Sequence, residues 1–309
     1  MELQNSKQIL KNALDGHYGV GAFNFVNIEM LKSILESAEE KKSPVIVQCS
    51  TGAIKYAGAE VLASIAKIYA STMTVPVVLN LDHGKTFEDC KNAIDAGFTN
   101  VMIDASSLPK AENIALTKKV VEYAHARNVT VEAEIGVLAG VEDEISASAD
   151  DARYTDPQEA YEFVKETGVD SLAIAIGTSH GTVKFKGEAK LRFDILEEVG
   201  KLLPDFPIVL HGASTIPQDM VKLAEEYGAK LTGSCGIPEE MIRRACSMNV
   251  CKVNTDSDLR ISYTAGIRKS LVENPENVDI RKYNGEGMKL VKQVVENKMD
   301  NVFGSSNRA

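Results

Sequence analysis

Eight short runs of apolar and β-branched residues recur along this chain of 309 residues, and stretches with helical spacing of apolar residues lie between them. Such alternation predicts βαβ units that build a parallel sheet. Eight is also the number of parallel strands that closes a TIM barrel. The strands are expected at residues 19–24, 44–49, 76–81, 100–103, 130–134, 171–176, 207–210 and 251–254.

An open, doubly wound sheet is the alternative, but no GxGxxG sequence follows the first run and no Walker A sequence occurs. We therefore favour an α/β fold with a single (β/α)8 TIM-barrel domain over residues 1–309. A helical extension is expected from about residue 274 to 309, with a helix at 287–297 and a polar, frayed tail. The other helices are expected at 28–41, 59–72, 86–96, 110–127, 157–167, 192–202 and 216–227.

Charge and composition exclude several kinds of partner. The formal net charge of -10 argues against binding to nucleic acid or to an anionic membrane. No apolar stretch approaches the roughly 20 residues that span a bilayer, and the first ten residues, MELQNSKQIL, lack the apolar region of a signal peptide. The five cysteines form no CxxC pair and are odd in number, so no disulfide framework is expected and a reducing compartment is. Cysteine is among the most buried residue types, so these five are expected to be small buried side chains. Together these features predict a cytoplasmic protein.

The dipeptide Asp82-His83 closes the third apolar run, and Gly84 follows it. Neighbouring side chains on a strand point to opposite faces, so the acid and the imidazole are expected to serve different tasks. His180 and His211 follow the sixth and seventh runs, about one βα unit apart, which predicts that they stand over neighbouring strands. Three imidazoles with an open fourth position are one ligand set of a catalytic zinc ion.

The loops after the last strands are rich in small residues. They read GTSHGTVK at 177–184, GAS at 212–214 and NTDS at 254–257. Backbone amides of small residues can approach an anion, and the loops after strands seven and eight often bind phosphate in TIM barrels. Such residues are also ordinary in turns, so both interpretations stay open. The acidic segment 136–156 is likewise either a mobile active-site loop or a solvated surface loop.

With these residues together, the sequence resembles the class II, zinc-dependent fructose-bisphosphate aldolases, and its compact loops are more similar to the IIB subgroup. The resemblance extends from about residue 21 to about residue 268. Its most specific motifs are LDHG at 81–84, EAEIG at 132–136, GTSHG at 177–181, LHGAS at 210–214 and KVNTDSD at 252–258. It implies that His83, His180 and His211 bind Zn2+, that Asp104 can hold a second or displaced metal ion, and that a monovalent cation, Na+ or K+, is allowed.

The resemblance also implies catalytic roles. Asp82 would be the general acid/base at the C4 hydroxyl, and zinc would stabilise the enediolate. Glu142 would exchange the proton on the enolate carbon, and Glu134 would orient the metal ligands. Substrate contacts would come from Asn24, Ser50, Gly181, Lys184, Gly212, Ser214, Asn254, Asp256, Ser257 and Arg260.

The implied reaction is the reversible cleavage of fructose 1,6-bisphosphate to dihydroxyacetone phosphate and glyceraldehyde 3-phosphate. The implied assembly is a homodimer or homotetramer, because Arg260 would reach the substrate of a neighbouring subunit. Asp256 and Arg260 favour fructose over tagatose bisphosphate, whereas Thr255 departs from the more usual aliphatic residue. The alternatives are an aldolase for tagatose 1,6-bisphosphate or another ketose phosphate, a Schiff-base aldolase that uses Lys252, and a non-catalytic barrel that binds sugar phosphates.

Overall fold

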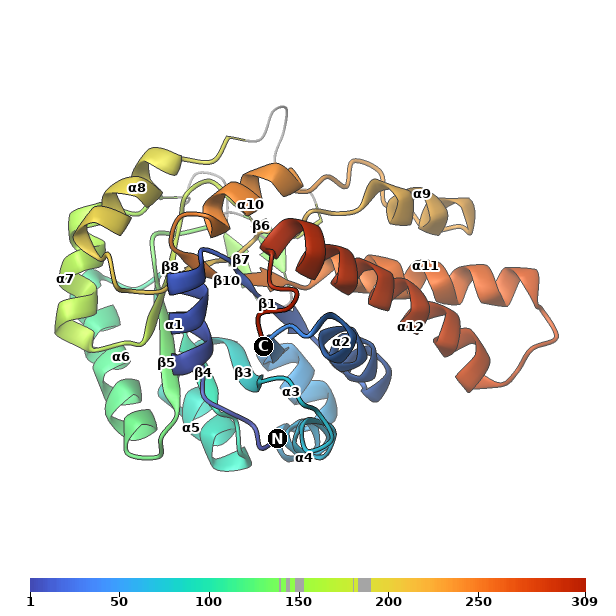
Figure 1. Ribbon diagram of the computed structural model, residues 1–309, viewed down its shortest axis with the longest axis horizontal. Helices are drawn as coiled ribbons and strands as arrows, with labels where there is room; N and C mark the ends of the chain where they lie inside the picture. Colours follow the sequence, from blue (N-terminus) through green and yellow to red (C-terminus); the bar gives the residue numbers. More distant parts are fainter. Residues whose placement is uncertain (139, 143–144, 148–152, 180, 183–189) are drawn as a thin grey trace.

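A closed, eight-stranded parallel barrel forms the centre of the molecule (Figure 1). The structure is a computed structural model that describes residues 1–138, 140–142, 145–147, 153–179, 181–182 and 190–309. The strands follow one another around the barrel in the order β1-β10-β9-β8-β5-β4-β3-β2. The predicted TIM barrel is confirmed, and the open-sheet alternative is wrong. The barrel strands are β1 (Val20–Asn24), β2 (Val45–Ser50), β3 (Val77–Gly84), β4 (Asn100–Ile103), β5 (Thr130–Ile135), β8 (Ser171–Ile174), β9 (Ile208–Leu210) and β10 (Val250–Thr255).

Helices surround the barrel, and most lie within a few residues of the predicted ranges. The predicted ones are α2 (Ile28–Lys41), α4 (Ala59–Ala70), α5 (Phe87–Ala96), α6 (Lys110–His125), α7 (Pro157–Thr167), α8 (Phe193–Leu202) and α9 (Gln218–Glu226). The elements that the sequence patterns did not single out are α1 (Lys7–Gly16), α3 (Thr51–Ala57), α10 (Glu239–Cys246), α11 (Ser257–Glu273) and a hairpin of β6 (Gly140–Glu142) and β7 (Ile145–Ala147).

Helix α1 closes the N-terminal end of the barrel. Its buried residues Ile9 and Leu10 belong to one apolar cluster with Val20, Ile46 and Val78, which come from three adjacent strands. Because alternate residues of a barrel strand face inward, this cluster fills the lower layer of the interior. The N-terminal end is therefore occupied, and a site inside the barrel can open only at the C-terminal ends of the strands.

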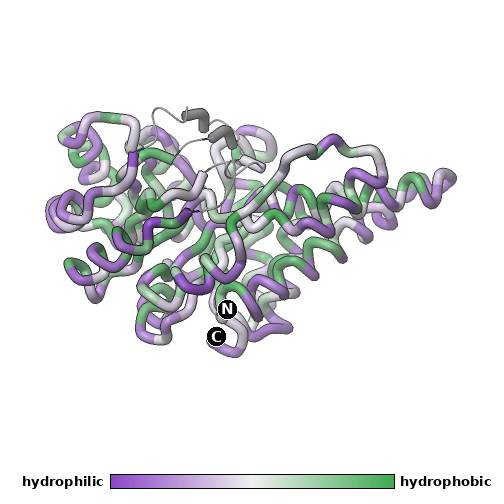
Figure 2. The backbone as a smooth tube through the Cα atoms, turned by 90° about the horizontal axis from the view of Figure 1, so that it is seen from above, coloured by the Kyte–Doolittle hydropathy of each residue, from purple (hydrophilic) through white to green (hydrophobic). Residues whose placement is uncertain are grey.

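The C-terminal segment is more ordered than predicted. Helix α12 (Ile280–Asn297) begins earlier than expected and packs against α11, so the two form a hairpin that reaches away from the barrel (Figures 1 and 2). It continues into a π-helix, η1 (Lys298–Phe303), whose Phe303 is buried. The expected frayed tail is wrong, because the backbone N–H of Asn307 donates to the carbonyl of Lys41 at the end of α2. Among the helices described, none is long and apolar enough to cross a membrane.

Candidate active site

The dipeptide Asp82-His83 lies at the C-terminal end of β3, where the strand is irregular. Between Leu81 and Gly84, β3 contains one residue more than the stretch of β4 opposite it. His83 has a left-handed backbone conformation with φ 52°, which is uncommon for a residue other than glycine. Both side chains consequently turn into the barrel mouth, and Asp82 Oδ1 lies 3.9 Å from His83 Nε2. The predicted orientation toward opposite faces is wrong, because a β-bulge interrupts the alternation.

Three buried side chains at the barrel mouth could hold a metal ion. His83, Glu134 and His211 each offer a ligand atom, and these atoms lie within 4.8 Å of one another. Glu134 Oε2 and His211 Nδ1 are 3.2 Å apart. Among the described residues, neither of these two buried atoms has a hydrogen-bond partner. Because buried polar atoms are nearly always satisfied, the pair is suited to a shared cation, and imidazole with carboxylate is a ligand set that zinc accepts.

The other nitrogen of His211 is held by a second carboxylate. His211 Nε2 lies 2.8 Å from Glu132 Oε1, so it donates there and leaves Nδ1 facing Glu134. Burial alone would lower the pKa of His211, but the hydrogen bond with Glu132 and the nearby Glu134 carboxylate outweigh it and raise this pKa to about 10. The surroundings of this ring therefore favour a positive charge. A carboxylate behind a metal-binding histidine is a common way to orient the ring.

Lys252 lies inside the barrel, below the mouth. Its Nζ is 2.8 Å from Glu132 Oε2, and both side chains are 0% exposed. Burial would raise the pKa of Glu132, but Lys252 and His211 outweigh it and lower this pKa to about 2. A Schiff-base lysine must be desolvated yet reachable and able to lose its proton. The buried ion pair places Lys252 in a structural role and gives no support to the Schiff-base alternative.

Asp104 lies beside His83, outside the three-residue cluster. Asp104 Oδ2 is 2.9 Å from His83 Nδ1 and 2.5 Å from Lys85 Nζ, while Oδ1 accepts from the hydroxyl of Ser106 at 2.7 Å. Burial would raise the pKa of Asp104, but the His83 hydrogen bond and the Lys85 ammonium hold it well below its usual range. In this arrangement Asp104 orients the His83 ring through Nδ1 and leaves Nε2 toward the mouth.

Two amide side chains hold the Asp82 carboxylate. Asn24 Nδ2 donates to Asp82 Oδ2 at 2.8 Å, and Asn254 Nδ2 donates to Asp82 Oδ1 at 2.9 Å. Asp82 is only 6% exposed, so these bonds replace much of its hydration. Each oxygen keeps further lone pairs, and a carboxylate fixed in this way is positioned to accept a proton from a ligand in the mouth.

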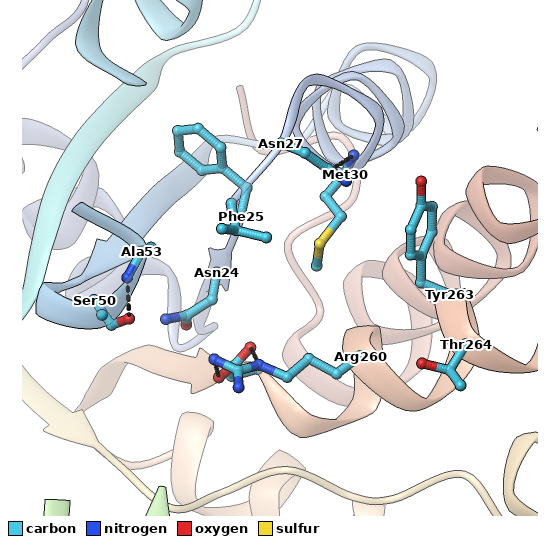
Figure 3. A pocket seen from close by; sticks show the side chains of 12 residues that line it. Asn24, Phe25, Asn27, Met30, Ser50, Ala53, Arg260, Tyr263 and Thr264 are labelled. Carbon is cyan, nitrogen blue, oxygen red and sulfur yellow. Dashed lines mark hydrogen bonds and ion pairs between the residues drawn. The ribbon is translucent and has the colours of Figure 1, made fainter. Parts of the chain in front are cut away.

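A cavity of about 550 Å³ lies beside Asp82 and contains four of the predicted substrate-binding residues. In Figure 3, Asn24, Ser50 and the head of Arg260 gather at one end, and Met30 and Tyr263 line the other. The fourth predicted residue is Asp256, whose carboxylate forms two contacts with Arg260, from Nε at 2.8 Å and from Nη2 at 2.7 Å. The Ser50 hydroxyl accepts from the backbone N–H of Ala53 and caps α3. The cavity therefore combines an Arg260–Asp256 ion pair with an apolar wall.

The expected phosphate loops meet at the same end of the barrel. Strands β8 and β9 are neighbours, as the spacing of the histidines predicted. Gly212 has φ 59°, and a Cβ there would lie 2.6 Å from the carbonyl oxygen of Ser179, so only glycine fits against this backbone. Ser214 and Ser257, each three residues after His211 and Asn254 respectively, are both buried. Gly181 also has a positive φ.

Three predicted residues are only partly covered or not covered by the structure. His180 and Lys184 lie outside the described residues. Glu142 is the last residue of β6, and its backbone pairs with Ile145, but its side chain is not among those described. Ser179, the residue before His180, is described, and its backbone contacts Gly212, the residue after His211.

Several site residues were absent from the sequence prediction. Glu132 stands in the EAEIG motif without a predicted role, and no role was predicted for Lys85, Gln48 or Asn80. Gln48 and Asn80 interrupt the apolar runs of β2 and β3, and both are fully buried. A polar residue in the middle of a buried strand needs a partner, and that was the available signal. The partners lie on other strands, so only the folded barrel shows them.

The chain is similar to known proteins over nearly its whole length. A family model described as fructose-bisphosphate aldolase class-II matches residues 4–308. The fructose-bisphosphate aldolases of Treponema pallidum (strain Nichols) and Helicobacter pylori (strain J99) are each 48% identical, over 99% of this chain and 98% and 99% of theirs. The YdjI aldolase from Escherichia coli K12 superposes with a TM-score of 0.79 at 31% identity, covering 99% of both chains. A putative fructose-1,6-biphosphate aldolase from Coccidioides immitis gives 0.82 at 28%, covering 97% and 96%.

The fold and the site together define a TIM-barrel enzyme with a candidate metal centre at the C-terminal ends of its strands. The chain belongs to the class-II fructose-bisphosphate aldolase family, and the resemblance inferred from its motifs is confirmed. It is therefore an aldolase, a lyase that breaks and forms carbon–carbon bonds.

Proposed function

We propose that this aldolase reversibly cleaves fructose 1,6-bisphosphate to dihydroxyacetone phosphate and glyceraldehyde 3-phosphate, with zinc bound by His83, His180 and His211. The observation that carries the proposal is the pair of buried atoms Glu134 Oε2 and His211 Nδ1, which lie 3.2 Å apart beside the restrained Asp82 carboxylate and, among the residues that the structure describes, have no hydrogen-bond partner. Zinc, when bound, supplies a Lewis acid that withdraws electron density from the ketone carbonyl.

Asp82 is proposed to act on the C4 hydroxyl. In the cleavage direction its carboxylate takes the hydroxyl proton as the C3–C4 bond breaks, and in the condensation direction it returns that proton. Asn24 and Asn254 hold the carboxylate from two sides, so that it does not have to be oriented during the reaction. Glu142 is proposed to exchange the proton on the enolate carbon, and Glu134 to orient the metal ligands through the His211 ring.

The two phosphates are proposed to bind at opposite sides of Asp82. One would lie among Gly181, Lys184, Gly212, Ser214 and Ser257, where backbone N–H groups and the N-terminus of the long helix α11 favour an anion. The other would reach the cavity that contains Asn24, Ser50, Asp256 and Arg260. The Arg260 guanidinium supports this assignment, because guanidinium can bind phosphate in a bidentate manner; to do so, Arg260 would exchange its two contacts with the Asp256 carboxylate for the phosphate.

Metal removal tests the central part of the proposal. We expect a chelator to abolish cleavage of fructose 1,6-bisphosphate and added zinc to restore it, while borohydride with substrate traps no covalent adduct. Replacing Asp82 by Ala is expected to abolish turnover and leave zinc bound, as measured by metal analysis of the purified variant. Full turnover by the Asp82→Ala enzyme would remove Asp82 from its assigned role, and a non-catalytic barrel predicts no turnover in either protein.

The choice of sugar is tested by comparing two substrates. We propose fructose over tagatose 1,6-bisphosphate because Asp256 and Arg260 stand together at the cavity. Cleavage rates for the two hexose bisphosphates decide the matter, and equal or faster tagatose cleavage would favour the alternative substrate. A monovalent cation, Na+ or K+, is part of the proposal and is tested by replacing both with a large organic cation in the assay.

A homodimer or homotetramer is also proposed. Four large apolar residues are exposed near the tip of the α11–α12 hairpin, which is the kind of surface that another subunit covers: Leu271, Val272, Val278 and Ile280. Light scattering during size-exclusion chromatography gives the subunit number directly, and a monomer would contradict this part. A cytoplasmic location is proposed as well, supported by five cysteines that are all free.

A further inference from the structure

A row of buried amide side chains crosses the barrel and ends at Asp82. Asn24, Gln48, Asn80 and Asn100 occupy in-register positions on the adjacent strands β1, β2, β3 and β4. Each is at most 6% exposed. Strands of a barrel are tilted, so such a row climbs from the lower layers of the interior toward the mouth.

The hydrogen bonds of this row run head to tail. Asn100 Nδ2 donates to Asn80 Oδ1 at 2.6 Å, and Asn80 Nδ2 donates to Gln48 Oε1 at 3.0 Å. Gln48 Nε2 then donates to Asn24 Oδ1 at 2.7 Å, and Asn24 Nδ2 donates to Asp82 at 2.8 Å. At the lower end, the Thr130 hydroxyl donates to Asn100 Oδ1 at 2.6 Å.

The direction of the row follows from chemistry. An ionised carboxylate only accepts hydrogen bonds, so Asn24 must turn its NH2 group toward Asp82. The oxygen of Asn24 then faces Gln48 and requires an NH2 group from it, and the same requirement passes to Asn80 and Asn100. The hydroxyl of Thr130 completes the row because it can donate as well as accept. All four amide dipoles therefore point their positive ends toward Asp82.

We propose that Gln48, Asn80 and Asn100 are positioning residues that act through Asn24 on Asp82. They fix the rotation of the Asn24 amide so that its NH2 group faces the carboxylate during catalysis. Hydrogen bonds in such chains strengthen one another in a low-dielectric interior, so the Asn24–Asp82 bond gains from every link behind it. The inference rests on the proposed role of Asp82 at the C4 hydroxyl.

A kinetic double-mutant cycle tests the proposal. Gln48→Met and Asn80→Leu each replace a buried amide by an apolar group of similar size, and each is made in the native protein and in an Asn24→Ala background. In the native background we expect Gln48→Met to lower kcat about 5- to 10-fold, the equivalent of one hydrogen bond, with a smaller change in KM. Asn80→Leu, one link further away, is expected to lower kcat less.

In the Asn24→Ala background neither substitution should lower kcat further, because the link to Asp82 is already absent. A purely structural role predicts the same fold-loss in both backgrounds. Ser305→Ala is the matched control, since Ser305 is buried and its hydroxyl accepts from Ser43, which precedes β2 at the N-terminal end of the barrel. We expect it to lower the melting temperature and leave kcat unchanged.

The outcomes separate the two hypotheses. Loss of kcat only when Asn24 is present supports the positioning row. Equal losses in both backgrounds, or unchanged kcat in the Gln48→Met enzyme, overturn it even when Asp82→Asn is inactive, and the proposed function then stands. An Asp82→Asn enzyme with native kcat overturns both. Asn80→Leu keeps the test usable if the Gln48→Met protein does not fold.

Discussion

Replacing Lys252 by Met removes the only charge that the structure places directly against Glu132 Oε2, within the described part of the chain. The two atoms, Lys252 Nζ and Glu132 Oε2, are 2.8 Å apart, and both side chains are 0% exposed. Methionine keeps most of the volume but leaves a carboxylate inside the barrel with His211 as its remaining partner. Breaking a buried pair from one side costs about 3–5 kcal/mol. Since His211 still donates to Glu132, we expect about 3 kcal/mol, the lower end of that range.

The assay is urea unfolding at fixed protein and zinc concentrations, with the slope of the transition compared between variants. The matched control is Glu132→Gln combined with Lys252→Met. In this double variant no charge is left unpaired, and the Gln carbonyl can still accept from His211. We expect it to recover at least about 2 kcal/mol relative to Lys252→Met. We also expect it to cleave substrate in excess zinc, whereas a Schiff-base enzyme without Lys252 would be inactive.

Two results would refute this reasoning. A Lys252→Met protein that loses less than about 1 kcal/mol would show that Glu132 is not held as a charge that depends on Lys252. A double variant that is no more stable to urea than Lys252→Met alone would show that the Glu132 and Lys252 side chains do not interact energetically. Full loss of activity in the stable, zinc-loaded double variant would return the Schiff-base alternative to consideration.

Three further predictions concern a second buried ion pair, two glycines and the pH dependence of stability. Lys298→Met should destabilise the protein by about 3–5 kcal/mol in the same urea assay, because Asp258 is 0% exposed and lies 2.7 Å from Lys298. Gly84→Ala should lower the stability by about 1–3 kcal/mol, since its Cβ would lie 2.9 Å from a carbonyl oxygen of β4. Gly285→Ala should raise the stability by about 0.5–1 kcal/mol, because Gly285 lies in the interior of α12 and a Cβ there would meet no atom beyond the adjoining helix backbone within 4 Å. Both changes are measured from melting curves. Because Glu132 has its pKa lowered to about 2, the folded state keeps its stabilising charge above the ordinary pKa of 4.5 and loses it as the pH falls toward 2. Unfolding followed from pH 5 to 2 should therefore show a steeper loss of stability in the native protein than in Glu132→Gln.

The strand pattern made the barrel predictable, because an apolar run bounded by polar turns can be recognised from neighbouring residues alone. The same holds for the strand-end histidines and carboxylates, which the parallel topology was expected to bring to one end. The orientation of His83 was not predictable in this way. Its left-handed backbone depends on a bulge relative to β4, and a bulge is a property of two strands together.

The order of the C-terminal tail was likewise not predictable from neighbouring residues. The letters SSNRA are polar and gave no local reason for order, yet the backbone of Asn307 is anchored by Lys41, far away in sequence. The short helix α3 also escaped prediction, since its cap at Ser50 is the last residue of a strand. Such elements are decided by contacts that form only once the barrel has closed.

The sequence by itself determined the fold class, the family and the set of groups available for chemistry, because these depend on local periodicity and on residue types at strand ends. Only the tertiary structure decided how the groups are paired. It set Glu132 between His211 and Lys252, turned Asp82 and His83 to the same side, and aligned Gln48 and Asn80 behind Asn24. The physical reason is that a buried polar group must find its partner across strands, and the register and tilt of the closed barrel determine which partner it meets.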